Sequence, residues 1–272
     1  MWRPAPSPGL QVALGGKIPE LEFGGDIIST LAALPAERLK SSELQFKPKL
    51  GAKMDDAAWQ DLKGLPGEWA LAYGSQTEHG MRGTSLKIRP GDYDMIRDAR
   101  NVLGSLSRLD VRDKIAEALE GPWHYEDLNC VAWGWDAAAL IDPAAIDTKV
   151  DNAPRRGVLG AYWLGWEALP LFPVINGETL GWETIGSSKG LRYPTWSEWL
   201  DYPDTRALML GLKGLGAAEC KAMGVVIWFA RYLQTHVSSG RLGWAREVPR
   251  TRSDQQFPGG SRSIQAPVIL IV

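Results

Sequence analysis

The stretch Gly157 to Val174, GVLGAYWLGWEALPLFPV, constrains the fold most, because it is almost wholly apolar and is broken by Pro170 and Pro173. It is shorter than the roughly 20 apolar residues that a membrane-spanning helix needs, and it contains the charged residue Glu167. Its aromatic side chains recur at helical spacing, at Tyr162, Trp163 and Trp166. Because proline ends a helix, we expect a buried helix that stops near Pro170 and continues as an extended segment, not a membrane anchor.

Glu167 needs a partner in this setting, because an isolated carboxylate beside Trp163 and Trp166 would be costly to bury. Arg155 and Arg156 precede the apolar stretch, and either of them could pair with it. The pattern favours an ion pair that locks the corner between helix and strand over a catalytic role for the carboxylate.

Periodic segments elsewhere predict helices early in the chain and strands late. Helical spacing covers the ranges 26–39, 54–67, 92–121 and 204–216, of which 92–121 is one broken helix or two. Strand-like patterns cover the ranges 128–136, 191–200, 221–248 and 266–272. The range 221–248 holds two strands joined near 238–240. Residues 68–75 fit either a buried strand or a short helix. We predict an α+β fold with helices mainly in the N-terminal half and antiparallel strands mainly in the C-terminal half. A Pro/Gly-rich leader, 1–25, would precede a single domain, 26–272, with a possible subdivision near 121–128.

Composition fits a globular protein that works in a reducing compartment. Hydrophobic residues make up 44% of the 272 residues and the net charge is −2, which excludes a uniformly basic nucleic-acid coat but leaves room for a local basic surface. Two distant cysteines, Cys130 and Cys220, argue against a disulfide framework and favour the cytoplasm. The 13 tryptophans are unusual. They are more typical of a tryptophan-rich core than of a binding surface, although both uses are known.

Motifs for catalysis or cofactor binding are missing from the sequence. His79, His124 and His236 lie in unrelated contexts without metal-ligand spacing, and no phosphate-binding loop, dinucleotide fingerprint or nucleophile elbow occurs. The glycine-rich segment 211–216 follows a helical pattern, so we interpret it as a helix end. We therefore expect no cofactor, no metal and no enzymatic activity.

Basic residues are clustered, and arginine dominates the later clusters, which suits bidentate contacts with phosphate groups. The candidate nucleic-acid contacts are Arg82, Lys87, Arg89, Arg155, Arg156, Arg192, Arg231 and Arg241. An alternative interpretation remains open: the same arginines could lie over tryptophans and form surface ion pairs.

The order of several segments resembles a family of CRISPR-associated proteins from type I-U (also called I-G) loci. The segments are MRGTSLKI, GPWHYED, RRGVLGAYWLGWEALPLFPV, LRYPTWSEWL and SSGRLGWA, which together span roughly 68–247, and EALPLFPV is the most specific. The chain departs from the family pattern at Tyr162, where an asparagine is usual, and at Tyr193, where tryptophan usually precedes the proline. The resemblance implies prokaryotic antiviral defence and carries over no catalytic residues.

Three functions are compatible with these features. The first is a non-enzymatic subunit of a type I CRISPR–Cas surveillance complex, with other Cas subunits and guide RNA or target DNA as partners and no membrane contact. The second is a metal-dependent nuclease or nucleotide hydrolase, for which His79, Glu167 and His236 would be the first residues to test. The third is an adaptor held by protein contacts alone, whose assembly would not depend on salt.

Overall fold

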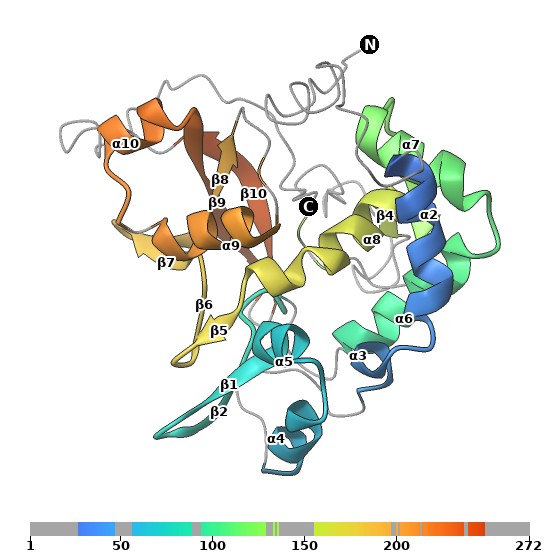
Figure 1. Cartoon of the computed structure of the whole chain (residues 1–272), viewed down its shortest axis with the longest axis horizontal. Helices are drawn as coiled ribbons and strands as arrows, with labels where there is room; N and C mark the ends of the chain where they lie inside the picture. The colour runs from blue at the N-terminus through green and yellow to red at the C-terminus, as the bar shows by residue number, and fades with distance from the viewer. Residues whose placement is uncertain are drawn as a thin grey trace.

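A computed structural model of the chain describes residues 27–46, 56–88, 94–128, 133, 135, 155–196, 200, 202–212, 214–236 and 239–247. Helices dominate its first half, in the order α2 (Ile27–Arg38), α3 (Ser42–Gln45), α4 (Asp56–Lys63), α5 (Gly67–Tyr73), α6 (Met95–Leu106) and α7 (Val111–Glu120). Strands dominate the second half (Figure 1), which confirms the predicted α+β class. The predicted leader 1–25 and the predicted strand 266–272 lie outside the described residues, as does most of the strand predicted at 128–136.

The region predicted as one broken helix or two is two helices, each with its own aspartate cap. The Asp94 carboxylate accepts hydrogen bonds from the backbone N–H groups of Ile96 and Arg97 at the start of α6. Asp110 does the same for Arg112 and Asp113 at the start of α7. Such caps satisfy N–H groups that have no partner within the helix, so they fix where each helix begins.

The ambiguous segment 68–75 divides between a helix and a strand. α5 ends at Tyr73, and Gly74 begins β1 (Gly74–Thr77), which pairs with β2 (Gly80–Gly83) in an antiparallel hairpin. A Cβ atom at Gly74 would lie 2.6 Å from the carbonyl oxygen of Arg82, so the two strands approach this closely only because position 74 has no side chain.

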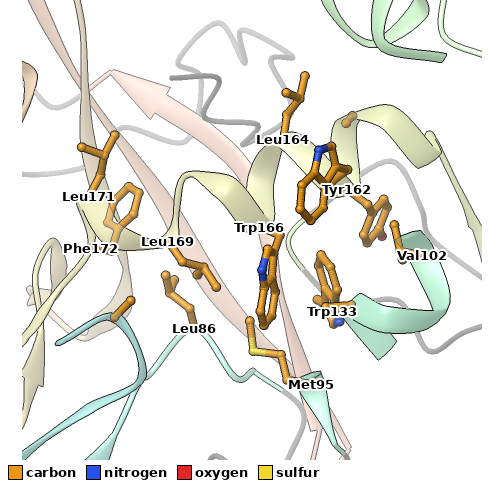
Figure 2. Close-up of a cluster of buried hydrophobic side chains, with 14 of the residues drawn as sticks. Leu86, Met95, Val102, Trp133, Tyr162, Leu164, Trp166, Leu169, Leu171 and Phe172 are labelled. Carbon is orange, nitrogen blue, oxygen red and sulfur yellow. The ribbon is translucent and has the colours of Figure 1, made fainter. Parts of the chain in front are cut away.

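The apolar stretch forms the helix and corner that its sequence predicts. α8 (Leu159–Glu167) is followed by the 3₁₀ turn η3 (Leu169–Leu171), which contains Pro170, and then by the short strand β5 (Val174–Ile175). Figure 2 shows side chains of α8 and η3 within the hydrophobic core. Trp166 packs against Trp69 and Trp133, with ring centroids 5.8 Å and 5.7 Å apart.

The tryptophan side chains that the structure describes pack mainly in the hydrophobic core. Every tryptophan whose exposure the structure describes is buried or half-buried, and Trp133, Trp163 and Trp166 are among the largest fully buried side chains. Tyr162, one of the departures from the family pattern, belongs to the same cluster, with its ring 5.4 Å from that of Trp133. The core interpretation of the tryptophans is therefore confirmed for the described residues.

A four-stranded antiparallel sheet fills the C-terminal half. Its order is β10 (Ser239–Glu247), β9 (Val225–His236), β8 (Ser188–Trp196) and β7 (Trp182–Ile185). The two strands predicted within 221–248 are β9 and β10, but Lys221 and Ala222 end helix α10 (Ala217–Ala222) instead of beginning the strand. The helix predicted at 204–216 is α9 (Tyr202–Gly211), which ends earlier than predicted, at the first glycine of the glycine-rich segment.

Two more antiparallel strand pairs complete the described strands. β5 pairs with β6 (Glu178–Thr179), and β3 (Glu126–Leu128) pairs with β4 (Arg155–Gly157). One cluster of buried hydrophobic residues extends from Leu44 to Leu242 and includes side chains on both sides of 121–128. The predicted domain boundaries themselves stay predictions.

Candidate nucleic-acid interface

The two faces of the four-stranded sheet differ in character. Residues alternate between the faces along a strand, and directly paired residues of adjacent strands share a face. One face carries residues of the main hydrophobic cluster, namely Leu191, Tyr193, Trp228, Ala230 and Leu242. This face is covered by the core. The opposite face is also partly buried, at Val225 and Phe229, but it carries the exposed Arg231.

That opposite face gathers arginines from three neighbouring strands. Arg192 of β8 and Arg246 of β10 both pair with Phe229 of β9, one on each side. Arg231 is the next residue of β9 on this face, and Arg241 pairs with Leu233, one position further along it. We call Arg192, Arg231, Arg241 and Arg246 the arginine face. Strand spacing and residue rise give it a backbone area of about 10 Å by about 13 Å.

A β-bulge in β10 brings Arg241 and Arg246 to the same face. These residues are five apart, so strict alternation would put them on opposite faces of the sheet. Their partners, Leu233 and Phe229, are four apart, because the register shifts between Leu242 and Ala245. The extra residue in β10 reverses the alternation once. Sequence reasoning did not select Arg246 as a site residue, because alternation alone gives no sign of the bulge.

The centre of the arginine face is apolar. The ring of Phe229 lies over Gly190, where an added Cβ would come within 2.8 Å of its Cζ atom, and Phe229 is buried. Arg192 has a counter-charge on β7, with its Nε 3.5 Å from Oε1 of Glu183. Arg231 is exposed and makes no ion pair or side-chain hydrogen bond with any residue that the structure describes. Of Arg192 and Arg231, Arg231 is therefore the more available to an anionic ligand.

The other predicted contacts are not part of this face. Arg82 lies on β2, and Lys87, which is half-buried and has an interaction partner, follows that strand. Arg155 and Arg156 form β4, where Asp127 of β3 is paired with Arg156. Arg89 lies outside the described residues. The structure thus brings together Arg192, Arg231 and Arg241 and places the described remainder on other elements.

Glu167 is paired, as its setting requires, but the partner that the structure describes is Arg38 of α2. The Nε and Nη2 atoms of Arg38 donate to the two carboxylate oxygens of Glu167 at 2.9 Å and 3.0 Å, and Nη1 donates to Glu43 at 2.6 Å. The guanidinium also lies 5.5 Å from the ring centroid of Trp69. The prediction of Arg155 or Arg156 as the partner is corrected by this geometry: Arg38 satisfies both oxygens from a distant helix. We call Arg38, Glu43 and Glu167 the arginine clamp.

The arginine clamp should make stability depend on pH. Burial raises the pKa of Glu167 above its ordinary value of 4.5, and the negative charge of Glu43 raises the pKa further. The hydrogen bonds and positive charge of Arg38 lower this pKa but do not cancel the rise. The native state therefore holds the proton to higher pH than the unfolded state. The contribution of Glu167 to the free energy of unfolding is fullest below pH 4.5 and falls as pH rises through the native pKa.

We expect the difference in unfolding free energy between the natural chain and Glu167→Gln to decrease as pH rises from about 4 to about 8. Urea unfolding at a series of pH values measures it, and the glutamine variant removes this titration while keeping the shape of the side chain. A difference that grows with pH would contradict the expectation.

The residues named for the nuclease hypothesis come from separate elements. His79 lies in the β1–β2 turn and is exposed, Glu167 is held by the arginine clamp, and His236 ends β9. Within the described part of the chain, no three His, Cys, Asp or Glu residues are grouped so that they could hold a metal ion. Glu167 has both oxygens engaged by Arg38, so the geometry gives it a structural role.

No helix in the described ranges is both long and apolar enough to cross a bilayer. The chain matches no family model, no curated protein and no solved structure. The resemblance to CRISPR-associated proteins therefore rests on the quoted sequence segments and stays a prediction.

Proposed function

We propose that this chain is a non-enzymatic, cytoplasmic subunit of a type I CRISPR–Cas surveillance complex, and that its arginine face contacts the backbone of guide RNA or target DNA. The observation that carries the nucleic-acid contact is the convergence of Arg192, Arg231, Arg241 and Arg246 on one sheet face. The type I-U/I-G setting comes from the sequence resemblance.

The chemistry of the arginine face fits a phosphate backbone. A guanidinium donates two parallel hydrogen bonds to a phosphate, and such contacts need no particular base sequence. The net charge of the whole chain is −2, so its attraction for a polyanion must come from a local concentration of arginine. Arg192 already has Glu183 as a counter-charge, so we expect the loss of Arg231 to weaken binding more than the loss of Arg192.

Binding of labelled single-stranded RNA, followed by fluorescence anisotropy at several salt concentrations, tests the phosphate contacts. Each phosphate contact with a single strand contributes about −0.7 to the slope of log K against log salt, so four arginines predict a slope near −3. We expect Arg231→Ala to reduce the affinity about tenfold and to flatten the slope by about 0.7.

Arg108→Ala is the matched control, because Arg108 is an exposed arginine just after α6, away from the sheet. Unchanged affinity in Arg231→Ala, or an equal loss in Arg108→Ala, would contradict the proposed interface. No RNA affinity, together with assembly into a complex that does not depend on salt, would instead favour the adaptor function, which uses protein contacts alone.

The cellular setting needs a separate measurement. The tagged chain should be purified from cells that express a CRISPR array and the neighbouring Cas subunits, and the bound RNA should be sequenced. Array-derived RNA together with Cas subunits supports the proposal. A lone protein without guide RNA would overturn it and make cleavage assays with magnesium or manganese the next test.

A further inference from the structure

The tips of two hairpins enclose a polar hollow that is separate from the arginine face. The hollow measures ≈ 510 Å³ and is lined by Thr77, Glu78, His79, Arg82, Asn176 and Gly177. These residues come from the β1–β2 hairpin and from the β5–β6 turn, whose tips lie near one another in Figure 1. Its volume falls within the range of about 300–1,000 Å³ that is typical of small-molecule sites.

Both walls of the hollow are held in place by specific contacts. The β5–β6 turn has positive φ angles at Asn176 (52°) and Gly177 (81°), and the backbone N–H of Gly177 donates to Ser75 Oγ at 3.0 Å. In the facing hairpin, Thr77 Oγ1 donates to the Gly80 carbonyl at 2.8 Å. An Asn-Gly pair at two positive φ angles is the preferred two-residue hairpin turn, so the sequence alone could have predicted this wall.

Arg82 is positioned by the opposite wall and yet has no partner for its charge. An ideal Cβ at Gly177 would lie 2.9 Å from Cγ of Arg82. The aliphatic part of the Arg82 side chain therefore packs against Gly177, in space that a side chain at position 177 would occupy. The Arg82 guanidinium forms no ion pair and no side-chain hydrogen bond with any described residue. A half-buried arginine that borders a hollow without a counter-charge is suited to an anionic ligand.

The neighbouring groups narrow the class of anion. Asn176 adds an exposed side-chain amide that can donate, and the His79 ring lies 3.2 Å from the carboxylate of Glu78. Glu78 is 84% exposed at the hairpin tip, so water screens its repulsion of an anion. Arginine and amide donors together match the several acceptor oxygens of a phosphate monoester, which carries about −1.5 to −2 charge at neutral pH.

We propose that the hollow between the β1–β2 and β5–β6 turns binds a terminal phosphate monoester, with Arg82 as the principal ligand. The phosphate belongs either to the end of a nucleic-acid strand or to a free nucleotide. This site shares no residue with the arginine face, so the phosphate-site proposal can be correct even if the proposed function is wrong.

Titration calorimetry of the full chain with AMP, adenosine, and a 5′-phosphorylated or 5′-hydroxyl tetranucleotide tests the site. We expect binding of phosphorylated ligands only, weakened about 10- to 100-fold by Arg82→Ala and less by Arg82→Lys, which keeps the charge but loses the bidentate fork. Arg97→Ala, at an exposed arginine on α6, is the control and should bind normally.

Preference for the phosphorylated tetranucleotide over AMP would identify a strand end as the ligand, and preference for AMP would identify a free nucleotide. Equal binding of both would support recognition of the 5′-phosphate itself. Equal binding of AMP and adenosine, no binding of either phosphorylated ligand, or unchanged affinity in Arg82→Ala would overturn the proposal. Arg231→Ala should leave AMP binding intact, which separates failure of this site from failure of the arginine face.

Discussion

Replacing Arg38 with methionine is expected to lower the free energy of unfolding by about 3 kcal/mol at neutral pH. The substitution keeps most of the apolar stem but leaves two carboxylates without their cation. The side chains of Glu43 and Glu167 are only 3% and 13% exposed, so water cannot replace the lost hydrogen bonds fully. Urea unfolding of the two proteins at the same pH measures the loss.

Two further variants separate the ion pair from simple packing. Combining Arg38→Met with Glu43→Gln and Glu167→Gln removes the uncompensated charges, and we expect this triple variant to recover much of the lost stability. Arg108→Met is the control for losing an exposed arginine and should change stability by less than about 0.5 kcal/mol. If Arg38→Met were as harmless as Arg108→Met, the clamp would not stabilise the fold.

Replacing Gly160 with alanine is expected to destabilise the protein by about 3 kcal/mol, although alanine favours helix formation by about 1 kcal/mol. An ideal Cβ at Gly160 would lie 2.1 Å from the Lys114 carbonyl oxygen and 3.1 Å from the Cβ of Ala118. Because the clashing atom belongs to the backbone of α7 and not to a movable side chain, α7 and α8 would have to move apart. Thermal or urea unfolding measures the effect.

Gly165→Ala, in the same helix, is the matched control. Its Cβ would meet the Trp135 ring at 3.5 Å, an ordinary contact, beside an apolar cavity of ≈ 30 Å³. We expect this variant to gain up to about 1 kcal/mol, because the helix propensity of alanine is not offset by a clash. Similar losses in both variants would show that glycine in α8 is needed for a reason other than close packing.

The local pattern of the sequence predicted much of the secondary structure. The helices at 27–38 and 95–120, the corner after Glu167, and the β9–β10 hairpin follow from apolar periodicity, proline and glycine positions. The choice between strand and helix at 68–75 was not possible from the sequence, because the segment is too short for periodicity to decide. The start of β9 was misplaced by a few residues, since Lys221 and Ala222 form the end of α10.

The candidate sites were less predictable than the elements that carry them. Clustering of arginine along the chain selected Arg192, Arg231 and Arg241 but also residues that lie on other elements. The Asn-Gly turn beside Arg82 had a clear signal, yet nothing in either hairpin alone indicates that the two turns would meet. Arg246 required the bulge in β10, which no composition or spacing argument supplies.

The sequence by itself determined the α+β class, the buried corner after α8, and the need for a cation beside Glu167, because each follows from neighbouring residues and the cost of burying charge. Only the tertiary structure decided that this cation is Arg38, 129 residues away, that four arginines share one sheet face, and that Arg82 borders a hollow. The physical reason is that strand register and helix packing are set by contacts between segments far apart in the chain, and local periodicity contains no information about which segments meet.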